Sequence, residues 1–110
     1  LDNGEKVMLF KVRHENGDDF LSGSWIKKDG SQKLLSSKDF QLKETDYSII
    51  SGKKIPTKWE IIVIDSDQLT INTVALNMNS WMDTSFPYWE GPISFSGDLS
   101  GVGYLEMTGY

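Results

Sequence analysis

The segment at residues 88–110 reads YWEGPISFSGDLSGVGYLEMTGY and is the part of the chain that decides the fold. Two runs with strand-like alternation flank residues 98–102, whose Asp, Ser and Gly favour a turn. A loop with an odd number of residues fixes which side chains share a face, because successive side chains of a strand alternate. If Gly97 lies opposite Gly103, the two strands of this predicted hairpin form one apolar face and one polar face.

The free energy of burial differs between the two faces of the hairpin. The apolar face carries Trp89, Gly91, Ile93, Phe95, Leu105, Met107 and Gly109. The polar face carries Tyr88, Glu90, Ser94, Ser96, Tyr104, Glu106, Thr108 and Tyr110. Burial of two ionised carboxylates without partners costs several kcal/mol each. We therefore expect the apolar face to pack into the core, with Glu90 and Glu106 facing solvent or a neighbouring domain.

The rest of the chain alternates short strand-forming runs with turn residues. Strands are expected at residues 6–13, 20–27, 32–36, 40–45, 47–50, 58–64 and 69–76. Residues 77–87 are expected to form an irregular apolar loop over a barrel mouth or against another domain. The spacing of roughly 8–12 residues predicts eight or nine antiparallel strands, and sequential hairpins favour an up-and-down β-barrel. A barrel of eight strands can hold one small ligand.

Composition narrows the possible functions. The chain has 110 residues, enough for one domain with its own core, and it has no cysteine, which excludes disulfides and thiolate metal sites. The net charge of -5 argues against nucleic-acid binding, which needs a basic face. No apolar run approaches the ~20 residues that a membrane-spanning helix requires. No cofactor is expected, and no metal, because Asp18–Asp19 and Asp65/Asp67 are short turn pairs without the further oxygen ligands of a calcium site.

The ending YWEGPISFSG…GVGYLEMTGY resembles the C-terminal signature of the AttH and carotenoid 1,2-hydratase (hydroxyneurosporene synthase) family. Segments at residues 1–4, 7–13 and 55–59 fit the same pattern in the same order. The resemblance implies a lipocalin-like β-barrel, normally the second of two such domains in one polypeptide. Residues 1–110 are therefore expected to form a single lipocalin-like domain, whose partner is an N-terminal lipocalin-like domain. The resemblance also implies an exported or cell-envelope protein, whose signal would lie outside this chain.

Candidate site residues follow from the hairpin and from the aromatic residues. Glu90 and Glu106 share a face and are weak candidates for acid–base catalysis, although a solvated or lysine-paired position is about twice as frequent for such residues. Ligand-binding candidates in an apolar pocket are Trp25, Trp59, Trp89, Phe95 and Met107. His14, the single histidine, lies beside a turn and is interpreted as a solvated surface residue.

Two classes of function remain open. One is an enzyme of the hydratase type, which would protonate a double bond of an isoprenoid or carotenoid-like substrate. The other is a non-catalytic carrier of an apolar molecule, accessory to an ABC export system, as the resemblance to AttH suggests. The acid-bearing strand of the hydratase branch corresponds to the first strand here, where Phe10 and Lys11 supply neither a phenol nor a carboxylate. We therefore expect apolar ligand binding, and no catalysis by this domain alone.

Overall fold

The computed structural model describes residues 1–64 and 67–110, and this part of the chain contains strands and turns but no helix. The described strands are β1 (Lys6–Val12), β2 (Phe20–Ile26), β3 (Gln32–Ser36), β4 (Phe40–Ile50), β5 (Lys53–Val63), β6 (Leu69–Ala75), β7 (Trp81–Met82), β8 (Tyr88–Gly97) and β9 (Gly101–Thr108). All pairings between them are antiparallel. The predicted all-β antiparallel fold is confirmed.

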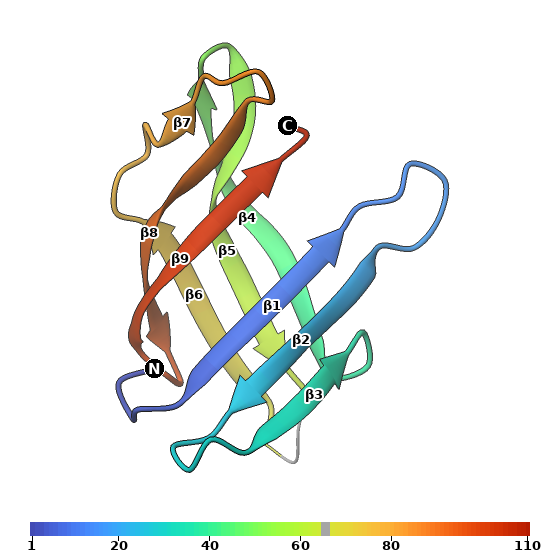
Figure 1. Cartoon of the computed structure of the whole chain (residues 1–110), viewed down its shortest axis with the longest axis vertical. Coiled ribbons are helices and arrows are strands. Elements are labelled where there is room, and N and C mark those ends of the chain that lie inside the picture. The colour runs from blue at the N-terminus through green and yellow to red at the C-terminus, as the bar shows by residue number, and fades with distance from the viewer. Residues whose placement is uncertain (65–66) are drawn as a thin grey trace.

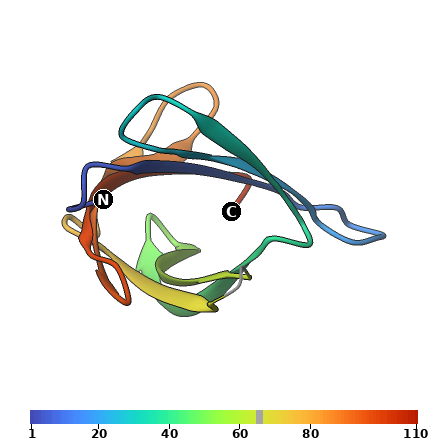
Figure 2. The same cartoon turned by 90° about the horizontal axis from the view of Figure 1, so that it is seen from below.

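The strands form two sheets that face each other (Figures 1 and 2). The smaller sheet has the order β1-β2-β3, and the larger has the order β4-β5-β6-β8-β7, with β9 also paired to β8. Within the described residues, β1 pairs only with β2 and β9 pairs only with β8. The continuous ladder of a closed up-and-down barrel is therefore not present in this part of the chain, and the sheets meet without backbone pairing.

The core lies mainly against the larger sheet. Its two longest strands, β4 and β5, pair along almost their full length, with a bulge around Asp46. Pro56 is buried in β5 opposite Tyr47, at a place that β6 does not reach, so no ladder hydrogen bond is lost there. The main cluster of buried hydrophobic residues comprises Ile50, Ile55, Trp59, Ala75, Trp89 and Met107.

The β8–β9 hairpin confirms the predicted faces within the two strands but not the predicted register, and Tyr110, expected on the polar face, instead packs against the buried cluster. Trp89, Ile93 and Met107 are buried, whereas Glu106 on the opposite face is exposed. Ile93, not Gly97, lies opposite Gly103, and Trp89 lies opposite Met107. In both registers odd-numbered residues lie opposite odd-numbered residues, so the shift leaves the same side chains on each face.

A contact with β6 explains why the register is shifted. Asp98 accepts a hydrogen bond from the Thr70 N–H and donates its own N–H to the Thr70 carbonyl. Gly97 consequently pairs with Ile71 on β6, which leaves three residues, 98–100, to connect β8 with β9. A Cβ on Gly97 would lie 2.4 Å from the Thr70 carbonyl oxygen, so this close approach requires glycine.

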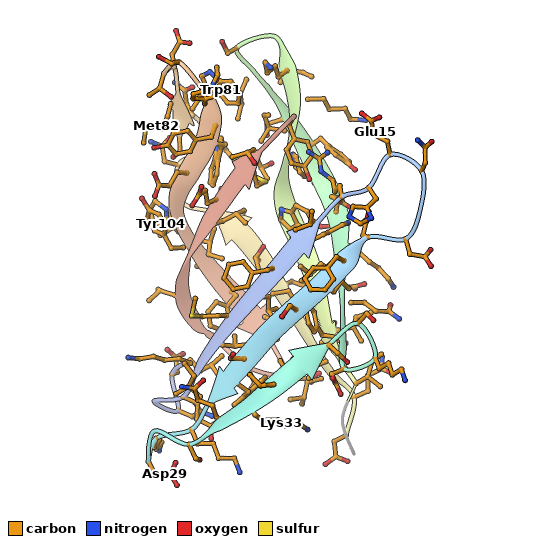
Figure 3. All side chains as sticks on the ribbon, turned by 45° about the vertical axis from the view of Figure 1, so that its right-hand side comes forward. Glu15, Asp29, Lys33, Trp81, Met82 and Tyr104 are labelled. Atoms are coloured by element: carbon orange, nitrogen blue, oxygen red, sulfur yellow. The ribbon has the colours of Figure 1, made fainter. Side chains whose placement is uncertain are left out.

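The apolar segment 77–87 is more ordered than predicted. Trp81 and Met82 form the short strand β7, in which Trp81 pairs with Trp89. Trp81 packs against the buried cluster, and the Trp89 indole N–H donates to the Met78 carbonyl. Figure 3 shows Trp81 and Met82 at one end of the molecule, beside the end of β8. The segment is thus held to β8 by both backbone and side-chain bonds.

Candidate functional site

A cavity of about 690 Å³ lies between the two sheets. Its apolar lining comes from inward-facing side chains of five strands, among them Val7, Leu9, Leu42, Trp59, Ile61, Ile93, Phe95, Leu105 and Met107. These side chains face one another because alternation along each strand places the apolar set on the inner surface of its sheet. Cavities of roughly 300–1,000 Å³ with such linings are typical of small-molecule sites.

Three of the five predicted ligand-binding residues line this cavity. Trp59, Phe95 and Met107 project into it from the larger sheet. Trp89 is completely buried and is not part of the lining. Trp25 lies on the smaller sheet, where its indole N–H donates to a Glu5 carboxylate oxygen at 2.7 Å, and it also lies outside the lining. The cavity thus combines the predicted residues of β5, β8 and β9 but not the other two tryptophans.

The predicted acid–base pair lies on the outer face of the hairpin. Glu90 and Glu106 are directly opposite each other in the register of β8 and β9. Glu106 is exposed and borders the open side of the cavity, and Glu90 is half-buried. The negative charge of Glu90, together with its hydrogen bond, raises the pKa of the adjacent Tyr88 phenol. These carboxylates therefore face away from the apolar interior.

A polar cluster at one end of the cavity was not predicted from the sequence. The Lys11 ammonium, which lines the cavity, lies 3.2 Å from Glu44 Oε1 and 3.3 Å from Asp19 Oδ2. Burial by itself lowers the pKa of Lys11, but the hydrogen bonds and charges of Glu44 and Asp19 outweigh it, and the pKa is raised. The backbone N–H of His14, followed by Lys11, lowers the pKa of Asp19. Lys11 is accordingly a charged, doubly paired ammonium.

Arg13 and Tyr110 complete this end of the cavity. Arg13 Nη2 donates to the carbonyls of Thr108 and Gly109 at 3.0 and 2.9 Å. Its guanidinium lies 3.7 Å from the centroid of the Tyr110 ring, in a cation–π arrangement. Both residues line the cavity, and burial raises the pKa of the Tyr110 phenol. The phenol is therefore a neutral hydrogen-bond donor at neutral pH.

The cavity opens along a seam between β1 and β9. These strands run in the same direction and lie side by side (Figure 1). Their first ends are joined by the Asp2 N–H, which donates to the Ser100 carbonyl, and their last ends are joined by Arg13. Figure 3 shows Tyr104 of β9 projecting outward, away from the interior. The seam is thus fastened at both ends and unpaired between them.

The structure adds two findings on polar groups and helices. In residues 1–64 and 67–110 no group of three His, Cys, Asp or Glu side chains could hold a metal ion, and Asp65 lies outside these ranges. No helix in the same ranges is long and apolar enough to cross a membrane. The hydroxyl of Thr73, a cavity-lining residue, is the buried side-chain polar atom in the described chain that lacks a hydrogen-bond partner.

Two antiparallel sheets that face each other across an apolar cavity with a polar rim place this protein in the all-β class with an internal cavity. It belongs to the AttH-like family, whose family model matches residues 1–110. The fold is similar to a crystal structure of a protein described as AttH from Nitrosomonas europaea, with a TM-score of 0.85 and 19% sequence identity. The similarity covers 99% of this chain but 36% of that one. A comparison with curated proteins gives no match. The predicted family resemblance is confirmed.

Proposed function

We propose that this domain binds an apolar, lipid- or isoprenoid-like small molecule in the cavity between its two sheets. The observation that carries the proposal is the cavity itself, about 690 Å³ in volume and lined mainly by aliphatic and aromatic side chains. An empty apolar cavity of this size is costly in water, because its lining loses both dispersion contacts and hydration. Occupation by an apolar molecule restores those contacts.

Binding can be tested by tryptophan fluorescence, because Trp59 lines the cavity. We expect retinol, used as an apolar probe, to quench the emission in a saturable way. Gly103 lines the cavity opposite Ile93, and a Cβ added there would meet Ile93 Cγ1 at 3.4 Å. Gly103→Leu should therefore place a side chain inside the cavity and weaken the saturable quenching.

The matched control is Ser96→Leu, which adds a similar side chain at an exposed position of β8 outside the cavity lining. This variant should bind retinol like the unmodified protein. Retinol binding that is absent in all proteins, or equal in both leucine variants, would contradict the proposed site.

A partner for the outer surface belongs to the same proposal. The smaller sheet exposes Met8, Phe10 and Leu34 on its outer face, with 52%, 55% and 78% of their surfaces accessible. An apolar face of this kind on a strand is typical of an interface. We propose that an N-terminal lipocalin-like domain of the same polypeptide packs here and that the pair forms the lipocalin-like assembly. The greater length of the Nitrosomonas chain is consistent with such a partner.

Non-catalytic binding is favoured over hydration by the position of the acids. Protonation of a double bond needs a carboxyl group that faces the apolar interior, but Glu90 and Glu106 project from the outer face. Glu44 is held by Lys11, and Glu5, which lines the cavity, accepts a hydrogen bond from the Trp25 indole. An extracytoplasmic location and a role beside an ABC exporter remain parts of the proposal, supported by the family resemblance. Copurification of the intact protein with a transporter from membranes would test that role.

A further inference from the structure

The cavity is amphipathic along its length. Its middle is lined by residues such as Leu42, Ile61 and Phe95, whereas one end is closed by Lys11, Arg13 and Tyr110. A second, polar hollow adjoins this end and shares Lys11 and Arg13 with the cavity. A ligand that fills such a space with its apolar part has its end placed among charged groups, so its chemistry must suit both surroundings.

The two cations at this end differ in their availability. Lys11 is already paired with two carboxylates, Glu44 and Asp19. Arg13 has no carboxylate within ion-pair distance among residues 1–64 and 67–110, and its recorded hydrogen bonds, both from Nη2, go to two backbone carbonyls. A guanidinium has five N–H donors in a planar fork. Arg13 therefore keeps its charge and its Nε and Nη1 donors for another acceptor.

The side chain of Arg13 is held in place by its surroundings. The two carbonyls fix one nitrogen, and the Tyr110 ring supports the guanidinium plane at 3.7 Å. This arrangement reduces the rotamer entropy that a flexible cation would lose on binding. The Tyr110 phenol, which is neutral at pH 7 even at its ordinary pKa, is a further donor on the residue that supports the guanidinium.

We propose that Arg13, supported by Tyr110, binds the carboxylate head group of an amphipathic ligand whose apolar tail occupies the cavity. This inference rests on the proposed function and names its ligand class: a long-chain or isoprenoid carboxylic acid. The two carbonyls occupy Nη2, so Arg13 offers its Nε and Nη1 donors, and a charge-assisted hydrogen bond from either is about twice as strong as one between neutral groups. Lys11 pairs with both carboxylates, Glu44 and Asp19, and so partly offsets their negative charge beside Arg13.

The test compares retinoic acid with retinol, which share a tail and differ in the head group. In tryptophan-quenching titrations at pH 7.4 we expect the protein to bind retinoic acid about tenfold more tightly, the equivalent of one charged hydrogen bond. Arg13→Gln should remove this preference by weakening retinoic acid binding far more than retinol binding, and Arg13→Lys should retain part of it. Added NaCl should weaken retinoic acid binding only.

Lys53→Gln is the matched control, because Lys53 also donates to a backbone carbonyl of the C-terminal segment, that of Tyr110, but does not line the cavity. It should keep the tenfold preference. Saturable retinol binding in Arg13→Gln shows that the variant is folded. Equal affinities for both ligands in the unmodified protein, or an unaltered preference in Arg13→Gln, would overturn the head-group assignment while leaving the proposed function standing. If neither ligand binds, both fall.

Discussion

At the scale of single residues, two buried threonines have opposite hydrogen-bonding states. The Thr73 hydroxyl has no partner, whereas the Thr57 hydroxyl lies 3.0 Å from the Ser48 hydroxyl. A buried polar group without a partner costs about 1–3 kcal/mol. We expect Thr73→Val to raise the free energy of unfolding by about 1 kcal/mol, measured by urea denaturation.

Thr57→Val is the matched change, and it should lower the free energy of unfolding by about 1 kcal/mol because it leaves Ser48 unpaired. Opposite signs for the two variants are the expected result. A loss of stability in Thr73→Val would show that its hydroxyl has a partner, such as an enclosed water.

The acidic groups predict a loss of stability at low pH. The Asp19 carboxylate has a pKa below its ordinary value of 3.8 in the folded protein. Its stabilising contribution is therefore present above about pH 4 and is lost as the pH falls through the lowered pKa. We expect the stability difference between the unmodified protein and Asp19→Asn to shrink as urea titrations go from pH 7 to pH 2. A difference that stays constant over this range would exclude a role for the charge.

Lys11 has the opposite linkage. Because its pKa is raised above 10.5, its contribution is present below that pH and disappears as the pH rises through the folded value. Lys11 therefore keeps its ion pairs with Glu44 and Asp19 throughout the neutral range.

At the scale of elements, the connection between β8 and β9 depends on one glycine. Gly97 has a φ of 130° and its Cα lies against the Thr70 backbone, so Gly97→Ala adds a steric clash to backbone strain. We expect it to lower the free energy of unfolding by about 2–4 kcal/mol. Gly30→Ala, at a φ of 85° with no atom within 4 Å of the new Cβ, should cost only the strain, about 1 kcal/mol. Equal effects in chemical denaturation would contradict the observed packing of Gly97.

The same hairpin shows which features of a strand can be predicted from sequence. Alternation is local, so the apolar side that contains Trp89 and Met107 could be assigned from the residues alone. The register could not, because it is set by the hydrogen bonds between Asp98 and Thr70, which are 28 positions apart. Short strand β7 was missed for the same reason: two residues carry too little pattern, and the partner strand stabilises them.

The polar end of the cavity could not be predicted from the sequence, because its residues lie far apart along the chain. In the sequence, Lys11 indicates only that a carboxylate is missing at this position, since no neighbouring residue shows that Glu44 lies beside it. Arg13 meets carbonyls 95 and 96 residues away. One signal was available: alternation on the first strand places Lys11 on the face of Val7 and Leu9, an unusual position for a lysine unless it has a partner.

At the scale of the whole molecule, β1 separates the cavity from an apolar outer surface. Leu9 faces the cavity, and the next residue, Phe10, is exposed on the outer face. We expect Leu9→Ser to abolish retinol binding and to lower stability by about 2–4 kcal/mol, whereas Phe10→Ser should change stability by less than about 1 kcal/mol. Urea denaturation and retinol titration of both variants measure these effects. If Phe10→Ser proved as damaging as Leu9→Ser, the assignment of the two faces would be wrong.

The seam between β1 and β9 bears on the range of ligands that can fit. In the described residues, the two strands are joined only near their ends, by the Asp2–Ser100 bond and by the bonds of Arg13 to Thr108 and Gly109. The middle of the seam can therefore widen without breaking any ladder hydrogen bond. The hydrogen-bond ladder of a closed barrel fixes its circumference, but the wall at this seam can move outward between its two joined ends. Ligands whose tails differ in thickness should consequently differ only gradually in affinity. The two joined ends of the seam, and not the strands between them, should limit the length of the ligand.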